Sequence, residues 1–143
     1  MRMTMEQYEA KIKKWAKKAP ESLRLALEKA AGEIIVYAQG RKLRGPKMPR
    51  GVPGGFDGST LAAPTGRLRG SLTKRVTVSG GRVVAQVGTN VKYAAIHEYG
   101  GRTGRNKSVE MPERPFLRPS VAAQKSRTLE IIGDAYIDAY RRA

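Results

Sequence analysis

The residue types that most often carry out catalysis are scarce in this chain. The sequence of 143 residues contains one histidine, His97, and no cysteine. Thiol nucleophiles and cysteine-type zinc sites are therefore excluded. His97 and Glu98 do not begin a His-Glu-x-x-His zinc motif, because Tyr-Gly-Gly follows them. We expect His97 to be a hydrogen-bonded packing or interface residue rather than a general base.

Carboxylates are also too sparse for metal chemistry in the middle of the chain. A nuclease needs several carboxylates gathered around Mg²⁺, yet only Asp57 and Glu98 lie between residues 40 and 109. The surroundings of the serines do not resemble a nucleophile elbow. The sequence therefore predicts a protein that is not an enzyme and that has no metal site and no cofactor. A hydrolase or nuclease would need an activity that depends on a metal or on His97.

Positive charge is the strongest compositional signal. The chain has 28 Lys and Arg against 12 Asp and Glu, which gives a net charge of +16. An excess of this size favours polyanions, above all nucleic acid, although a basic surface can also serve solubility alone. Residues 40–66 carry five basic groups and one acidic group, and residues 67–92 carry six basic groups and no acidic group.

Residues 40–66 form an extended basic segment rich in Gly and Pro, without apolar periodicity. A loop of this length inside a compact domain is generally either functional or disordered. Two interpretations stay open: a solvated insertion, or a mobile cationic arm that follows a phosphate backbone. The candidate contact residues are Arg41, Lys42, Arg44, Lys47 and Arg50.

Two helices are predicted before this loop. Thr4 and Gln7 have the spacing of a capping box, and apolar residues then recur at helical spacing, which predicts an amphipathic helix over residues 1–18. Pro20 suits the first turn of a second helix that runs to about Gly40. The core stripe of this second helix consists of Leu23, Leu27, Ala30, Ile34 and Ala38, joined by Ala31 and Ile35.

After the loop, a Thr-capped helical turn is predicted from Thr65, followed by a β-hairpin. Residues 75–78 and 83–87 are rich in Val and flank Gly80-Gly81, which is a good hairpin signal. Because a hairpin alone is marginal in water, we expect this one to pack on the helices or to join a larger sheet.

The remaining elements are predicted from short patterns. Residues 93–101 indicate a short helix closed by glycines, and residues 102–110 indicate a second polar loop. Residues 111–119 contain three prolines and are expected to be extended. The C-terminal helix is predicted from about Ser120, with one stripe formed by Leu129, Ile132, Tyr136 and Tyr140.

Length and hydropathy predict one domain over residues 1–143, kept in the cytosol unless it leaves in a larger particle. A chain of this length can bury a hydrophobic core, whereas two domains of half this length would each have a core too small to be stable alone. No apolar run approaches the ~20 residues of a membrane span, and residues 1–18 lack the apolar region of a secretory signal.

Two short motifs carry a resemblance to a known family. Residues 93–100 read Tyr-Ala-Ala-Ile-His-Glu-Tyr-Gly, and residues 111–117 read Met-Pro-Glu-Arg-Pro-Phe-Leu. Together with Thr65–Leu72 and the hairpin, they appear in the order seen in the virion-morphogenesis proteins of tailed bacteriophages, which are called neck, tail-completion or minor tail proteins. The chain resembles this family from about Ala26 to Ala139.

The resemblance implies an α+β fold: a small, largely antiparallel β-sheet flanked by a long N-terminal helix and a C-terminal helix. It implies a structural subunit of the head–tail connector, in a homo-oligomeric ring expected to be a hexamer. Such a ring would join the connector to the tail tube and surround the DNA channel. The basic loop is longer than expected of the family, so it could face either the DNA or an adjacent ring.

The partners that this implies are neighbouring connector or stopper proteins, tail-tube or tail-terminator proteins, and packaged double-stranded DNA held by nonspecific electrostatics. No membrane partner is expected. The location would be the head–tail junction of the virion, and the host cytoplasm during assembly. The alternative function is a free-standing, sequence-nonspecific nucleic-acid-binding protein, which the net charge favours, although aromatic RNA-binding signatures and an evident helix-turn-helix are missing.

Within this picture, the motifs supply candidate subunit contacts. Aromatic residues anchor many protein interfaces, and small residues and prolines let chains approach closely. Ordinary core packing is the alternative for the aromatic residues. The candidate interface residues are Tyr93, His97, Tyr99, Pro112, Arg114, Pro115 and Phe116.

Overall fold

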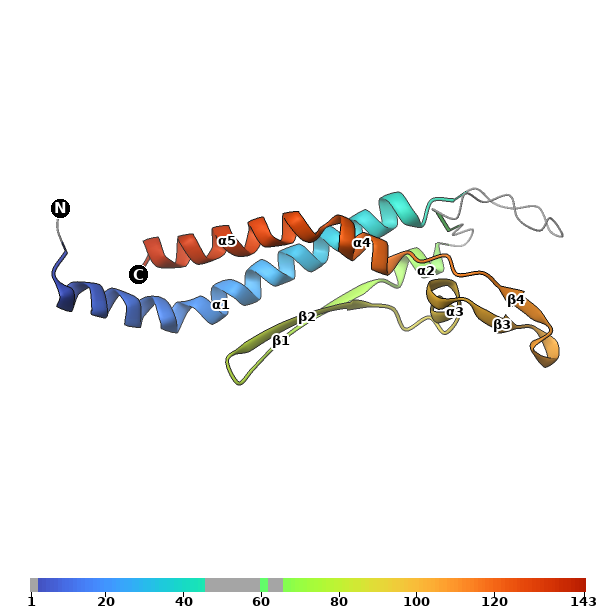
Figure 1. Cartoon of the computed structure of the whole chain (residues 1–143), viewed down its shortest axis with the longest axis horizontal. Coiled ribbons are helices and arrows are strands. Elements are labelled where there is room, and N and C mark those ends of the chain that lie inside the picture. Colours follow the sequence, from blue (N-terminus) through green and yellow to red (C-terminus); the bar gives the residue numbers. More distant parts are fainter. Residues whose placement is uncertain (1–2, 46–59, 62–65) are drawn as a thin grey trace. The chain divides into compact units, whose positions relative to one another are not determined.

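The computed structural model describes residues 3–45, 60–61 and 66–143 (Figure 1). Helices and short antiparallel strands are mixed along the chain, so the predicted α+β class is confirmed. The chain divides into two compact units, which are described separately: Met1–Gly32 with Arg75–Gln86 and Lys125–Ala143, and Glu33–Lys74 with Val87–Gln124. The single domain over residues 1–143 stays a prediction.

The N-terminal half of the chain contains one long helix, α1 (Met5–Tyr37), where the sequence predicted two. The predicted capping box is present: the Gln7 amide donates to Thr4 Oγ1 at 3.3 Å, and the Thr4 amide donates to Gln7 Oε1 at 3.0 Å. Pro20 lies inside the helix, where proline costs about 3 kcal/mol because it removes a backbone hydrogen bond and its ring clashes with the preceding turn.

Packing on both sides of Pro20 explains why the helix continues. Before the proline, the rings of Trp15 and Tyr136 of α5 (Lys125–Arg141) lie 6.0 Å apart. After it, Ala26 and Ala30 are buried against Ile131 of the same helix. Because α5 contacts α1 on both sides of Pro20, these contacts favour one continuous helix over two separate ones.

The apolar stripe of α5 is shifted from the predicted one. Ile131 and Ala139 are buried, whereas Leu129 is 60% exposed. Ile132, Tyr136 and Tyr140 are half-buried at the edge of the contact. When apolar residues occupy two adjacent stripes of a helix, the sequence does not fix which stripe faces the partner helix. Here the small alanines of α1 leave room for Ile131, so the stripe that contains Ile131 is buried.

The predicted hairpin is formed by β1 (Thr73–Ser79) and β2 (Arg82–Gly88). Gly80 and Gly81 have φ values of 56° and 75°, and two positive φ values are what a type I′ turn requires. The pair is a two-stranded sheet and does not join a larger one in the described part of the chain. No residue of these two strands is fully buried.

The second unit has its own core, which includes Leu43 and Leu61 from the predicted basic loop. Its buried residues are Ala38, Leu43, Leu61, Leu68, Leu72, Val91, Ala94 and Phe116. The Leu61 amide donates to the Lys42 carbonyl at 2.7 Å, and the Gly45 amide donates to the Leu61 carbonyl at 3.1 Å.

The start of this loop is helical, since residues Ala38–Lys42 form a π-helical turn, η1. Residues 46–59 and 62–65, which include the predicted Thr65 cap, lie outside the described residues. The short helix α2 (Arg67–Gly70) follows Gly66, whose φ is 69°.

Residues 102–110, which were predicted to be a polar loop, form most of a second antiparallel pair. Strands β3 (Gly101–Thr103) and β4 (Val109–Met111) pair with Gly101 opposite Met111, and the 3₁₀ turn η2 (Arg105–Lys107) joins them. Strands of three residues are too short to show an alternating pattern. The expected extended stretch over residues 111–119 also ends early, because α4 (Leu117–Ala123) begins at Leu117. Pro119 lies in its first turn, where a missing N–H costs little.

Candidate assembly site

The two family motifs meet through the side chain of Glu98. Glu98 lies near the end of α3 (Ala94–Tyr99) and is only 5% exposed. Its Oε2 accepts the amides of Phe116 at 2.8 Å and Leu117 at 3.0 Å, and its Oε1 accepts the amide of Arg118 at 2.8 Å. These amides begin α4, where backbone donors have no partner inside the helix and the helix dipole is positive. Glu98 therefore caps α4 from a distant segment.

Arg118 completes this clasp, the name used below for Glu98, Arg118 and the backbone that they bind. The Arg118 Nε lies 3.2 Å from Glu98 Oε1, and its Nη2 donates to the Glu98 carbonyl and, at 2.9 Å, to Glu113 Oε2. Its guanidinium carbon lies 5.0 Å from the centre of the Tyr99 ring. One side chain thus connects the end of the first motif to the second.

The clasp keeps Glu98 ionised. Burial raises the pKa of its carboxyl group, but the backbone donors of Leu117, Arg118 and Phe116, together with the Arg118 side chain, lower it, and the net pKa lies below the ordinary 4.5. A carboxylate that accepts several backbone N–H groups is stabilised in its charged form. At neutral pH the cap is therefore negative and complements the positive end of α4.

Backbone contacts bring the motifs together beside the clasp. The Arg114 amide donates to the His97 carbonyl at 2.6 Å. Gly100 has a φ of 69°, and a Cβ there would lie 3.0 Å from both the Glu113 amide nitrogen and the Met111 carbonyl oxygen. The glycine at the end of the first motif is thus required by its backbone conformation and by the close approach of the second motif.

Gly100→Ala should lower the free energy of unfolding by about 2–4 kcal/mol, which combines left-handed strain with overpacking against backbone. Urea unfolding followed by circular dichroism measures this change. Gly133→Ala is the matched control, because Gly133 has nothing within 4 Å of its Cβ position. Since alanine is the better helix former, the control should raise stability by up to about 1 kcal/mol. Equal destabilisation by both substitutions would contradict the assignment.

Two predicted interface residues lie outside the clasp and are exposed. Tyr93 is 41% exposed and Tyr99 is 68% exposed. The Tyr93 ring meets the half-buried His97 ring edge-on at 5.9 Å. Burial, and then the positive charge of Arg114, lower the pKa of His97. His97 Nδ1 is buried and has no hydrogen-bond partner within the described chain.

The other predicted interface residues differ in exposure. Phe116 is 0% exposed and belongs to the core of the second unit, which favours the core-packing alternative for it; its role as a subunit contact stays a prediction. Its amide donates to Glu98 Oε2. Pro112 is exposed, and Arg114 and Pro115 are half-buried.

The structure places three of the five predicted DNA-contact residues. Arg41 and Arg44 are exposed and Lys42 is half-buried, at and just after η1. Lys47 and Arg50 lie outside the described residues. Whether these side chains face DNA or a neighbouring ring stays a prediction.

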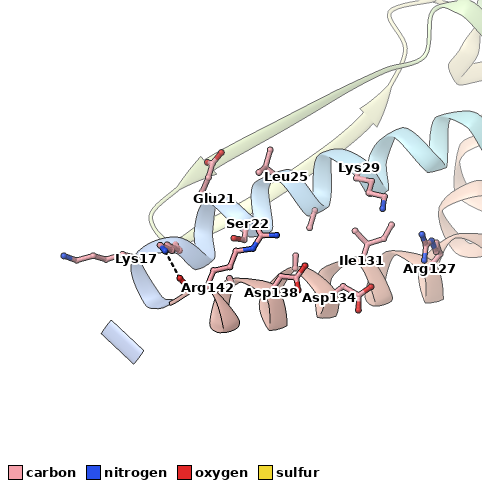
Figure 2. A pocket seen from close by; sticks show the side chains of 14 residues that line it. Lys17, Glu21, Ser22, Leu25, Lys29, Arg127, Ile131, Asp134, Asp138 and Arg142 are labelled. Atoms are coloured by element: carbon pink, nitrogen blue, oxygen red, sulfur yellow. Dashed lines mark hydrogen bonds between the residues drawn. The ribbon is translucent and has the colours of Figure 1, made fainter. Parts of the chain in front are cut away.

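A groove between α1 and α5 in the first unit was not predicted from the sequence. It has a volume of about 680 Å³, and Figure 2 shows Ile131 pointing from α5 toward α1. The Lys18 Nζ donates to the Arg142 carbonyl at 3.0 Å at one end. Small residues such as Ala26 and Ala135 on the facing helices were the available signal. Its rim combines five basic and three acidic side chains: Lys17, Lys18, Lys29, Arg127, Arg142, Glu21, Asp134 and Asp138.

Comparison with known proteins identifies the family. The model of the phage virion morphogenesis family matches residues 47–136, which is more than half of the chain. The chain belongs to this family. The matched span contains both motifs of the clasp, and it begins at residue 47 rather than near Ala26, where the resemblance was expected to begin.

A curated relative of this phage virion morphogenesis protein is the Mu-like prophage FluMu G protein 2 of Haemophilus influenzae. The two are 61% identical over 33 residues, which is 23% of this chain and 24% of the relative. The match therefore spans about a quarter of the relative's length. No solved structure matches the chain.

Family membership indicates a structural rather than an enzymatic role and an association with the virion. In this virion morphogenesis protein, the described residues contain no group of three or more His, Cys, Asp or Glu that could hold a metal ion. No helix within the described ranges is long and apolar enough to cross a membrane.

Proposed function

We propose that this chain is a structural subunit of the phage head–tail connector, in a neck or tail-completion ring. The ring would join the connector to the tail tube and surround the DNA channel. The observation that carries the proposal is the clasp. It joins the two family motifs, and the buried Glu98 carboxylate binds three backbone amides and the Arg118 side chain, which is a structural use of a carboxylate.

The clasp supports an assembly role because it holds the exposed Tyr99 in place, next to a second exposed tyrosine, Tyr93. Tyr99 lies under the Arg118 guanidinium and Tyr93 against His97, yet both remain substantially exposed. Tyrosines held in fixed positions lose little freedom on binding, and they are enriched among the residues that dominate interface energies. A neighbouring subunit would cover the two tyrosines with a surface other than its own tyrosine surface. Head-to-tail contacts of this kind produce a ring when the rotation between subunits brings the last one back to the first.

The charge of the chain agrees with a place around packaged DNA. A net charge of +16 in each copy favours closeness to phosphates, and phosphate contacts need no particular base sequence. In this proposal the other partners are the adjoining connector or stopper protein and the tail-tube or tail-terminator protein. In the same proposal the role of the chain is structural, without catalysis and without a cofactor.

Light scattering on the purified protein, with and without isolated tails, tests ring formation. We expect a ring that salt does not dissociate, or assembly onto tails only. Tyr93→Ala combined with Tyr99→Ala should abolish assembly while leaving the thermal midpoint of the subunit nearly unchanged. Tyr8→Ala is the control, because Tyr8 is a tyrosine of α1 with a similar exposure of 47%. Absence of the protein from purified phage particles would overturn the proposal.

The net charge also favours a second candidate, a free-standing nucleic-acid-binding protein. This candidate expects a monomer that shifts short duplexes, with an affinity that falls steeply as salt rises, and it expects no assembly onto tails. The same light-scattering measurement therefore separates the two functions.

A further inference from the structure

The β1–β2 hairpin has one polar, basic face. In β2, Val83, Ala85 and Val87 are half-buried, whereas the residues between them are exposed. Because successive residues of a strand point to opposite sides, the two sets lie on opposite faces. The two-residue turn places Ser79 opposite Arg82, so alternate residues of β1 share the exposed face. This outer face consists of Thr73, Arg75, Thr77, Ser79, Arg82, Val84 and Gln86.

The outer face has the chemistry of a phosphate-binding surface. Guanidinium, hydroxyl and amide groups are the side chains that most often contact the phosphates of DNA, and arginine binds them with two parallel hydrogen bonds. No Asp or Glu occurs anywhere from residue 67 to residue 92, so no carboxylate of this segment competes with phosphate. Arg75 lies four residues along the strand from Ser79, which separates it from Arg82 by about 13 Å.

We infer that the outer face of the β1–β2 hairpin binds the phosphate backbone of double-stranded DNA without base recognition. A two-stranded ribbon fits the major groove of the duplex, which is about 12 Å wide, and can also lie along its backbone. This inference deepens the proposed function, because it names an ordered element that would contact DNA in the channel. It rests on that function only for the identity of the DNA as the packaged genome.

The composition of the outer face favours DNA over an acidic protein as its partner. The energetic centre of a protein interface is usually apolar or aromatic. Val84, 39% exposed, is the one apolar side chain on this face, and no aromatic residue is present. On the opposite face Val76, Val83, Ala85 and Val87 are half-buried, while Lys74 and Val78 are exposed, so most of the apolar side chains lie away from the outer face.

The salt dependence of DNA binding tests the inference quantitatively. Fluorescence anisotropy with a short mixed-sequence duplex, repeated over a series of salt concentrations, gives the slope of log affinity against log salt. Each lost phosphate contact reduces the slope by about 0.9. Arg75→Gln combined with Arg82→Gln should therefore weaken binding and reduce the slope by about 1.8.

Lys13→Gln combined with Lys14→Gln is the matched control, because it removes the same charge from exposed positions of α1. We expect its slope to equal that of the wild type, and both double variants to keep the wild-type thermal midpoint. Equal slopes in the hairpin variant and the control would overturn the inference. So would competition by polyglutamate as effective as that by unlabelled duplex, because the surface would then suit any acidic polymer or protein.

Light scattering on the same preparations separates this inference from the proposed function. If wild-type rings form but the hairpin variant keeps the wild-type slope, only the assignment of the hairpin fails. If the slope falls as expected but the protein neither forms rings nor joins tails, the ring proposal fails and the DNA-binding face stands.

Discussion

Glu98→Ala is expected to lower the free energy of unfolding by about 3–5 kcal/mol, because three backbone donors at the start of α4 lose their acceptor at once. The carboxylate is 5% exposed and holds the amides of Phe116, Leu117 and Arg118 at 2.8–3.0 Å. Water can replace the carboxylate only in part, because Phe116, whose amide the carboxylate accepts, is fully buried. Urea unfolding of the variant and the wild type measures the difference.

Glu113→Gln is the control for the charge alone. Glu113 also binds Arg118, but its side chain is 60% exposed, and exposed ion pairs contribute about 0–1 kcal/mol. A loss for Glu98→Ala no greater than that for Glu113→Gln would show that the cap contributes little to stability.

The same carboxylate makes stability depend on pH in a defined direction. Its pKa in the folded protein lies below the ordinary 4.5, so near that pH the unfolded chain binds more protons than the folded chain. The stabilisation is therefore complete above about pH 4.5 and is lost as the pH falls through the folded pKa. Thermal midpoints of the wild type should fall in this acid range, and those of Glu98→Gln should fall less. Parallel curves would show that another group is responsible.

Phe116→Ala should cost about 3–5 kcal/mol, the usual effect of removing a buried aromatic ring from a core. The side chain is 0% exposed and contacts the core of the second unit. Phe116→Leu keeps most of the apolar volume and should cost about 1 kcal/mol. Denaturant unfolding of the isolated subunit measures both.

Val121→Ala is the control for truncation on the same helix, α4, because Val121 is 48% exposed, and it should change stability by no more than about 0.5 kcal/mol. This comparison also separates the two roles considered for Phe116. A subunit contact would leave the isolated chain stable and impair only assembly, whereas a core residue destabilises the chain before any assembly occurs. A stable Phe116→Ala subunit would support the interface role.

Glu98 shows why the centre of the site was not predicted. From the sequence, Glu98 was considered only as a possible metal-site residue, in a zinc motif with its neighbour His97 or with Asp57 among carboxylates for Mg²⁺. Its real partners lie 18 to 20 residues away. The structure places the N-cap position of α4 at Phe116, whose side chain cannot accept a hydrogen bond, so an acceptor comes from another segment; the sequence had placed the start of this helix at about Ser120.

The sequence by itself determined the features that depend on near neighbours. The capping box at Thr4, the Gly80-Gly81 turn and the short helix before Gly100 follow from local spacing and backbone preference, and the two motifs were enough to indicate the family. Only the tertiary structure decided the continuity of α1 through Pro20, the pairing of β3 with β4, the burial of Phe116 and the capping by Glu98. The continuity of α1, the burial of Phe116 and the capping by Glu98 each depend on a contact with a distant segment, which leaves no periodic trace in the sequence. The β3–β4 pair is local, but its strands of three residues are too short to show a pattern.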